Sequence, residues 1–283
     1  MELSGTTPTF PSDFLPDGNP LVSTGRSPSF TPVSGAFGFL KDLPGGFVAS
    51  LTGQYVERAP KAAELFSRGA HNATGTFDIG DPNLKIESAK SVEIGIRHPG
   101  GPFRRLTGVL CDDAFETCGN PDAGLKQAVY SQRDAVFRGG EFQSQWDVLP
   151  LWSGVFGIEN QFDVVRATFT DGSNVPRIPP VRVGGGFFWR DANWLARINL
   201  LHAFSHTDIA ANETTTTGYN DLRAEISYTK TFPGRPLGEV QAFTVGIYGQ
   251  NLLNDDMRNS VSFLKDEVLM PGRGVRAFAS VKF

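Results

Sequence analysis

The fold is decided by stretches such as Leu222-Arg223-Ala224-Glu225-Ile226-Ser227-Tyr228-Thr229, in which apolar and polar residues alternate one by one. Successive side chains of a β-strand point to opposite faces, so this stretch predicts a strand with one apolar and one polar face. The same alternation recurs at residues 47–56, 91–97, 243–248 and 275–283. Within the last of these, Phe278 is the exception, because it falls among the polar positions. The dominant period of two predicts an all-β, antiparallel fold.

Eleven or twelve such stretches can be counted, with 125–149 read as one strand or two. They lie at residues 30–41, 46–57, 88–97, 103–109, 125–149, 153–169, 180–191, 193–206, 218–232, 239–251 and 273–283. Most are longer than the five or six residues typical of strands in ordinary sheets. The connections alternate between tight turns, at 42–45, 98–102 and 233–236, and long segments, at 58–87, 110–124, 169–179, 207–217 and 252–272. Long strands joined in this rhythm favour a transmembrane β-barrel over a soluble β-sandwich, which stays the weaker alternative.

Aromatic residues stand near several strand ends, where a membrane interface favours them: Tyr55, Trp189, Trp194, Tyr219 and Tyr248. The composition agrees with a strand-rich protein, because Gly (32) and Phe (23) are frequent and Met (3) is scarce. A formal net charge of −4, with no basic stripe, argues against a nucleic-acid partner.

The beginning of the chain carries no recognisable export signal, because Met1-Glu2-Leu3-Ser4-Gly5 lacks both a basic and an apolar region. Residues 1–29 are rich in Pro, Ser and Thr and show no periodicity, so we expect a loop or disordered leader there. The barrel is expected to occupy residues 30–283. Neither a Walker A, a G-x-S-x-G nor an H-E-x-x-H motif is present, and nothing predicts an enzyme.

Several strings, in order, resemble the barrel of TonB-dependent outer-membrane receptors. They are Arg58-Ala59-Pro60 with Glu64-Leu65-Phe66, then Gly80-Asp81-Pro82-Asn83-Leu84, Glu87, and Ser91-Val92-Glu93-Ile94-Gly95. Further along come Tyr130–Ala135 with Gly139-Gly140-Glu141, and Pro176-Arg177-Ile178-Pro179-Pro180 with Arg182. The C-terminal signature is Gly249-Gln250-Asn251-Leu252-Leu253-Asn254, Arg258, Pro271-Gly272-Arg273 and the terminal Phe283.

This resemblance implies an outer-membrane receptor that takes up a scarce nutrient with energy supplied through TonB. The resemblance to zinc-uptake receptors makes zinc, or another metal ion or chelate, the expected cargo, and no resident cofactor is expected. Expected partners are the lipid of the bacterial outer membrane, the TonB complex, and the barrel-assembly machinery, which would recognise Phe283. A complete barrel of the family has about 22 strands and encloses a plug.

Compared with a complete receptor of the family, this chain supplies about half the strands. A TonB box and a plug domain are not recognisable in it. We therefore expect a C-terminal fragment that is not transport-competent alone. Residues 103–109 also look too short to cross a bilayer at about 3.3 Å per residue, which suggests a missing strand. The alternative is a self-contained outer-membrane pore of about twelve strands, whose first and last strands would have to pair.

Four groups of residues carry possible chemistry. His71, Asp78 and Asp81, in the long segment 58–87, are candidate metal and ligand-binding residues, although Asp81 could simply build a turn. Cys111 and Cys118 are expected to form a disulfide, with two free thiols as the alternative. His202 and His206 have H-x-x-x-H spacing, but on a strand they would be about 13 Å apart and could not share an ion. The run Gly184-Gly185-Gly186 is expected to mark a close backbone approach.

Overall fold

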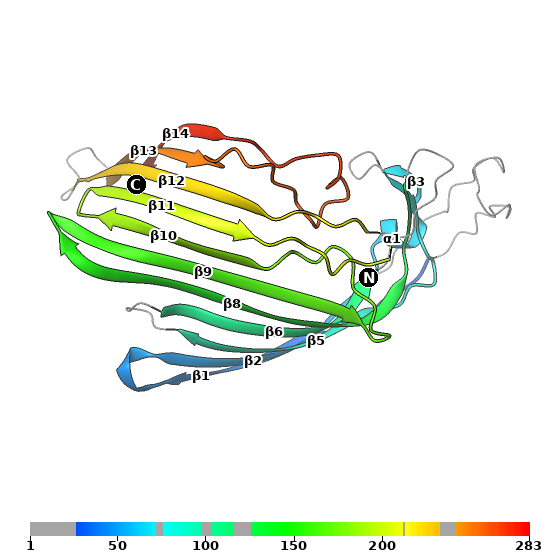
Figure 1. The fold of residues 1–283 in the computed structure, drawn as a ribbon. Helices are drawn as coiled ribbons and strands as arrows, with labels where there is room; N and C mark the ends of the chain where they lie inside the picture. The colour runs from blue at the N-terminus through cyan, green and yellow to red at the C-terminus, as the bar shows by residue number, and fades with distance from the viewer. Residues whose placement is uncertain (1–26, 72–75, 98–102, 116–125, 212, 233–240) are drawn as a thin grey trace.

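The structure is a computed structural model that describes residues 27–71, 76–97, 103–115, 126–211, 213–232 and 241–283. Its main feature is a sheet of eleven strands in which neighbours along the chain are neighbours in space (Figure 1). In the described residues no helix is long and apolar enough to cross a membrane.

The strands of the main sheet pair antiparallel in the order β1-β2-β5-β6-β8-β9-β10-β11-β12-β13-β14. Their bounds are β1 (Gly35–Asp42), β2 (Val48–Arg58), β5 (Glu87–Arg97), β6 (Phe103–Phe115), β8 (Gln132–Leu151), β9 (Gly154–Phe169), β10 (Arg182–Arg190), β11 (Trp194–Ala203), β12 (Tyr219–Thr231), β13 (Ala242–Gln250) and β14 (Gly274–Lys282). Every alternating stretch corresponds to one of these strands, which confirms the predicted fold class. The ambiguous segment 125–149 divides into a short β7 (Lys126–Val129) and the long β8.

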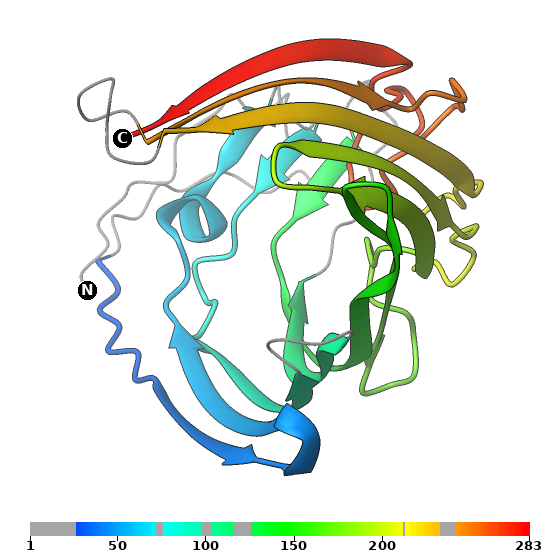
Figure 2. The ribbon, with the colours of Figure 1, turned by 90° about the vertical axis from the view of Figure 1, so that its left-hand side faces the viewer.

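The sheet is an open arc (Figure 2). Strands β1 and β14 stand at the two ends of the strand order and do not pair with each other in the described residues. Of the predicted tight turns, the one at 42–45 is found as the short η2 helix (Pro44–Gly46), while 98–102 and 233–236 lie outside the described residues. The arc is therefore part of a barrel wall, and the described sheet does not form the closed twelve-stranded pore.

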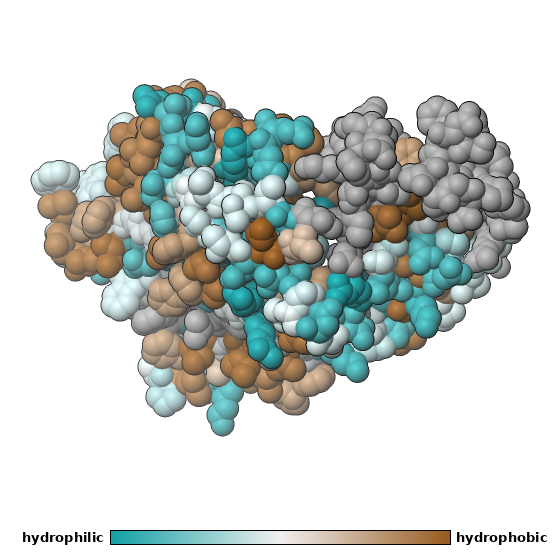
Figure 3. Space-filling view, turned by 45° about the vertical axis from the view of Figure 1, so that its right-hand side comes forward, coloured by the Kyte–Doolittle hydropathy of each residue, from teal (hydrophilic) through white to brown (hydrophobic). Residues whose placement is uncertain are grey.

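The two faces of the arc differ in chemistry. On the convex face large apolar side chains are exposed, among them Phe39 (66%), Ile94 (63%) and Ile247 (52%). Leaving such a side chain in water forgoes about 1.5–3 kcal/mol each, so this face requires an apolar environment. The concave face carries polar and charged residues, including Gln161, Arg197 and Glu225. In Figure 3 hydrophobic residues gather over the strands, and hydrophilic residues gather toward the end of the arc that carries the long connections, which we call the loop end.

The registers explain the exceptional position of Phe278. It pairs with Gly246 on the polar, concave face, and its ring covers the space that a side chain at Gly246 would fill, 2.5 Å from an added Cβ. Two of the expected interfacial aromatics also face the wrong way for a girdle, because Tyr219 and Tyr248 share the concave face with Arg223 and Glu225. That expectation is therefore wrong for those two residues.

The expectation that the strand beginning at residue 103 ends at 109 is also wrong. Strand β6 has 13 residues and pairs with both β5 and β8, so its length gives no reason to infer a missing strand, which stays a prediction. Strand β6 therefore includes residues 110–115, which were expected in the loop 110–124, and Cys111 belongs to the strand. Cys118 lies outside the described residues, so its pairing with Cys111 stays a prediction.

The remaining helix and strands lie at the loop end of the arc. They are α1 (Ala62–Phe66), β3 (Arg68–His71), β4 (Thr76–Ile79) and β7, of which the three strands form a small separate sheet. The two buried apolar clusters contain only loop-end residues, around Leu65 in one case and Phe169 in the other. Both clusters of buried apolar residues in the described part of the chain thus lie at this end of the arc, whereas Phe188 is buried near the opposite end of β10.

Candidate functional site

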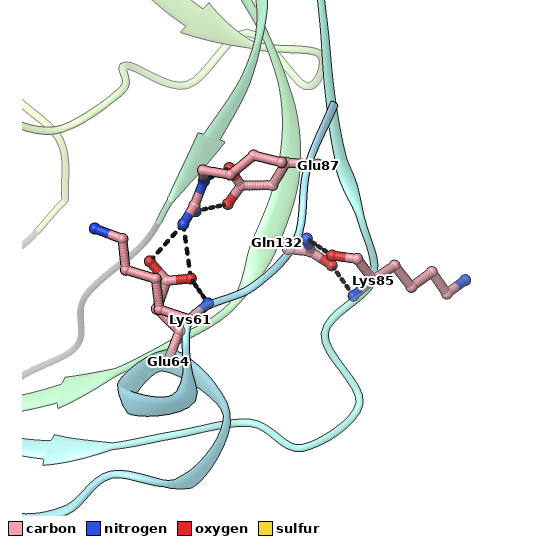
Figure 4. Close-up of polar contacts among 6 residues, drawn as sticks. Lys61, Glu64, Lys85, Glu87 and Gln132 are labelled. Carbon is pink, nitrogen blue, oxygen red and sulfur yellow. Dashed lines mark hydrogen bonds and ion pairs between the residues drawn. The ribbon is translucent and has the colours of Figure 1, made fainter. Parts of the chain in front are cut away.

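The long connection between β2 and β5 is held by one arginine at the end of β2. Arg58 donates through Nε and Nη2 to the Glu87 carboxylate, at 2.8 and 2.6 Å, and through Nη1 to both oxygens of Glu64, at 2.9 and 3.0 Å (Figure 4). Glu64 also accepts a hydrogen bond from the backbone N–H of Lys61, 2.8 Å away, which caps the start of α1. A planar guanidinium suits such two-sided binding, because its donors form a rigid fork.

Below this ion network lies an apolar cluster of Leu65, Phe66 and Leu84, packed against Phe30 and Tyr130. Gly80 passes so close to α1 that an added Cβ would lie 2.6 Å from the main chain of Leu65 and Phe66. The backbone N–H groups of Gly80 and Asp81 donate to the carbonyls of Ser67 and Glu64. We call the assembly of Arg58, Glu64, Glu87, this cluster and Gly80 the loop-end knot.

Two of the three predicted metal ligands, Asp78 and Asp81, lie beside the loop-end knot. Asp81 accepts hydrogen bonds from the backbone and side-chain nitrogens of Asn83, at 2.8 and 3.1 Å, and so builds a turn. Asp78 accepts from the Thr76 hydroxyl at 2.6 Å and from the Tyr130 hydroxyl at 3.4 Å. Burial raises the pKa of Tyr130, and the nearby Asp78 raises it further. His71 is exposed at the end of β3, where it pairs with Thr76.

Among the residues that the structure describes, no three His, Cys, Asp or Glu side chains are grouped to hold a metal ion. Metal binding by His71, Asp78 and Asp81 therefore stays a prediction. His202 lies on β11, 2.9 Å from the Asn220 amide oxygen, whereas His206 lies beyond the strand in a bridge with Thr216, so the two histidines do not share one strand as expected.

A second polar centre joins three other long connections, at 170–181, 204–218 and 251–273. The Glu213 carboxylate accepts from the backbone N–H of Arg177 (3.1 Å), from that of Ala210 (3.2 Å) and from Nζ of Lys265 (3.2 Å). Both charged side chains are buried, with 8% of Glu213 and 6% of Lys265 exposed. We call this centre the three-loop clasp.

Two further residues of the three-loop clasp are perturbed by burial. Arg177 has a left-handed backbone (φ 60°) and stacks its guanidinium on the Phe263 ring, 2.9 Å from the centroid. Desolvation lowers the pKa of Arg177 to about 10, against an opposing contribution from Glu213. Desolvation also lowers the pKa of the buried His206. Strained backbone and buried charge of this kind are maintained only where the surrounding contacts hold them.

Asn251 connects the three-loop clasp to the sheet. It is fully buried with a left-handed backbone (φ 45°), a conformation that Asn tolerates better than most residues. Its side chain donates to the carbonyls of Asp255 and Pro271 and accepts from the N–H of Asp255. Its backbone N–H donates to Asp221 on β12. The asparagine of the C-terminal signature thus holds the last long loop together and ties it to β12 through these hydrogen bonds.

The concave wall forms a shallow polar basin of about 350 Å³. Arg197 and Glu159, which both line the basin, form an ion pair at 3.4 Å. Outside the basin, Arg182 of β10 pairs with Asp163 of β9 at 3.0 Å. Of the glycine run on β10, Gly186 confirms the predicted close approach, because a Cβ there would lie 2.4 Å from the Ile198 carbonyl oxygen. A wall of alternating charges and amides can bind a polar polypeptide or solute through hydrogen bonds.

Sequence reasoning missed Glu213 and Lys265, which are 52 residues apart. Neither belongs to a recognisable motif. The Pro176–Pro180 string and the C-terminal signature indicated that two of the three loops are specialised, but neither string contains Glu213 or Lys265.

The comparisons with known proteins agree with this architecture. A family model described as "TonB dependent receptor-like, beta-barrel" matches residues 9–252. A solved structure titled "Copper transporter OprC" is similar with a TM-score of 0.68 and 17% sequence identity, over 92% of this chain. The matched region is 40% of that protein's length, and at this identity the likeness concerns the fold. This chain therefore belongs to the TonB-dependent receptor-like β-barrel family, a family of outer-membrane transporters rather than enzymes.

Proposed function

We propose that this chain forms the C-terminal barrel wall of an outer-membrane receptor for energy-coupled uptake of a metal ion or metal chelate. The observation that carries the proposal is the difference between the two faces of the arc, since the convex face is apolar and the concave face is polar. The long connections that the structure describes lie together at one end of the arc. An apolar belt suits the membrane, and a polar concave wall suits a plug or a hydrated solute.

The expected cargo is zinc or a chelated metal, captured at the loop end with His71, Asp78 and Asp81 as candidate ligands. The name of the similar copper transporter supports metals as a class and adds copper as a second candidate. Energy would come from the TonB complex acting on the plug of the intact receptor, so the arc alone would not transport. Residues 1–29 are proposed as a leader and Phe283 as the signal read by the barrel-assembly machinery.

Uptake of radioactive zinc and copper by cells that depend on the intact receptor tests this function. We expect TonB-dependent accumulation of one of these metals, reduced severalfold by the double substitution His71→Ala and Asp78→Asn. Asp81→Asn is excluded from that pair, because Asp81 builds the turn at Asn83. His202→Ala is the matched control, since His202 lies on β11 outside the loop 58–87. Unchanged uptake in the double variant would show that His71 and Asp78 are not ligands of the metal. Growth of the deletion strain that does not depend on the metal supply would show that the receptor does not carry metals.

A further inference from the structure

Two arginines lie directly opposite each other on the convex face, where its apolar belt ends toward the loops. Arg138 of β8 and Arg166 of β9 are partners in the register of these strands, and both residues are exposed. They share the convex face with Phe142 and Phe162, another register pair, because every second residue of a strand faces the same way. Arg166 also forms an ion pair with Asp208, a residue of one of the long connections, which places both arginines at the loop end.

The depth of the arginine pair follows from the length of β9. Phe156, near the other end of the same face, is about 33 Å from Arg166 along the strand at about 3.3 Å per residue. A strand tilted by about 40° converts this length into about 25 Å of height, which is the height of an outer-membrane apolar belt. In the membrane location of the proposed function, the arginines therefore lie at the outer boundary of the belt, because long loops face outward in such barrels.

The positive charge of the pair is only partly neutralised. Both side chains of the ion pair between Arg166 and Asp208 are more than half exposed, so this ion pair contributes little. Arg138 forms no hydrogen bond or ion pair in the part of the chain that the structure describes. Asp134, the next acidic residue on the same face of β8, is about 13 Å away along the strand. Like charges directly opposite each other destabilise a strand pair, so an anion between the two guanidinium groups would be stabilising.

We infer that Arg138 and Arg166 hold the phosphate group of a membrane lipid at the outer boundary of the belt. Charge complementarity supports this occupant, because a phosphate accepts the paired N–H donors of a guanidinium in charge-assisted hydrogen bonds. Depth supports it as well, since anionic lipid head groups lie at the boundary between hydrocarbon and water and attract basic residues there.

A lipid also gains contacts that a free phosphate lacks. The acyl chains of a lipid whose phosphate lies between Arg138 and Arg166 would run along the belt beside Phe142 and Phe162. Burial of apolar surface then adds to the ion pairing. The inference rests on the membrane location in the proposed function and goes beyond it, because it assigns a lipid site that is separate from the polar concave wall.

Titration of phosphatidic acid into the intact receptor in a neutral detergent, read by native mass spectrometry, tests this site. The measured quantity is the Kd of the first bound lipid. We expect the double variant Arg138→Gln and Arg166→Gln to raise this Kd about tenfold. The matched control is the double variant Lys41→Gln and Lys230→Gln. It removes the same charge from exposed positions of the convex face at the opposite end of the arc and should leave the Kd unchanged.

Three results would overturn the inference. Equal Kd values for the receptor and the arginine variant would show that the arginines do not hold the phosphate. An equal rise in the lysine control would show general attraction of an anionic lipid. Displacement of phosphatidic acid by inorganic phosphate at constant ionic strength would identify free phosphate as the ligand.

A second measurement keeps the lipid site separate from the proposed function. Brominated phosphatidylcholine in nanodiscs quenches tryptophan fluorescence where the belt meets lipid, and Trp146 lies on the convex face opposite Ile158. Quenching together with an unchanged Kd in the arginine variant contradicts only the phosphate site. Absent quenching contradicts the membrane location, on which both proposals rest.

Discussion

The loop-end knot and the three-loop clasp hold the same end of the arc but are built differently. The knot is made within one connection and its two flanking strands, so Arg58, Glu64 and Glu87 follow one another within 30 residues. The clasp gathers Arg177, Glu213 and Lys265 from three connections, and its central ion pair is buried. The knot is partly exposed, with 39% of the Arg58 side chain accessible. The loop-end knot joins residues that are close in sequence and partly exposed to solvent. The three-loop clasp joins residues that are far apart in sequence and buried.

The difference bears on how each loop can move. A buried ion pair that loses one member leaves an uncompensated charge, so the clasp should open all three of its connections together. An exposed network loses less, because water replaces the missing partner. The connection 59–86 can therefore loosen alone, while the segments 170–181, 204–218 and 251–273 behave as one body.

The largest effect is expected from Lys265→Met. Removing the ammonium group leaves the Glu213 carboxylate buried without its countercharge, which should cost about 3–5 kcal/mol of local stability. Hydrogen exchange read by mass spectrometry should show faster exchange in all three connections of the clasp and unchanged exchange in 59–71. The double variant Lys265→Met and Glu213→Gln should recover part of the loss. Faster exchange in 251–273 alone would contradict the idea of a single body.

The next effect tests the knot through its close contact. In Gly80→Ala the new methyl group would lie 2.6 Å from the backbone of α1, so the connection must shift, at a cost of about 1–3 kcal/mol. Limited proteolysis should then cut the connection 59–86 several times faster. Gly69→Ala is the matched control in the same connection, because no atom lies within 4 Å of a Cβ there. Equal cleavage of both variants would refute the close packing.

The same contrast explains which parts could be predicted from the sequence. Strands such as β12 were predictable because alternation along a strand directly reports its two faces. The motif around Arg58 was noticeable because its members are near one another in the chain. The three-loop clasp was not, since Glu213 and Lys265 come together only after the sheet has placed their loops side by side.

Two predictions from the sequence were wrong for a related reason: the position of a residue in a paired strand decides its environment more strongly than its residue type does. Tyr248 was expected at a lipid interface, although it alternates with Ile247 and so shares the polar face with Thr244. Residue type was there given more weight than position parity. Strand β6 was expected to stop at Val109 because the cysteine and acidic residues that follow resemble a loop, but pairing with the long β8 continues the strand to Phe115. Neighbouring strands can override local propensity.

A smaller effect is expected from Arg58→Lys. A lysine keeps the charge, but its three donors sit on a single nitrogen, so it cannot reproduce the four hydrogen bonds that the guanidinium makes to Glu64 and Glu87. We expect a loss of about 1 kcal/mol, discounted for exposure, and a modest rise in proteolysis of 59–86. Arg166→Lys is the control, because Arg166 and Asp208 form an ion pair in which both side chains are more than half exposed. A loss at Arg166 as large as at Arg58 would mean that the fork geometry contributes nothing.

The smallest effect concerns pH and separates the two centres without changing a charge by mutation. His206 lies in the three-loop clasp, and burial lowers its pKa below the ordinary value of 6.5. Nearby Glu213 and Asp208 oppose that shift, whereas Lys265 adds to it. The unfolded loop therefore takes up a proton at a higher pH than the folded loop does.

It follows that stability from the neutral imidazole is complete above about pH 6.5 and is lost as the pH falls through the lowered folded pKa. Hydrogen exchange in 204–218, corrected for its intrinsic pH dependence, should accelerate between pH 7.5 and pH 5. His206→Gln should remove most of this acceleration, and His202→Gln should not. Because the backbone bridge between His206 and Thr216 does not titrate, the opening should stay partial. Acceleration of equal size in the connection 59–71 would show that acid loosens the whole loop end and that the clasp has no titration of its own.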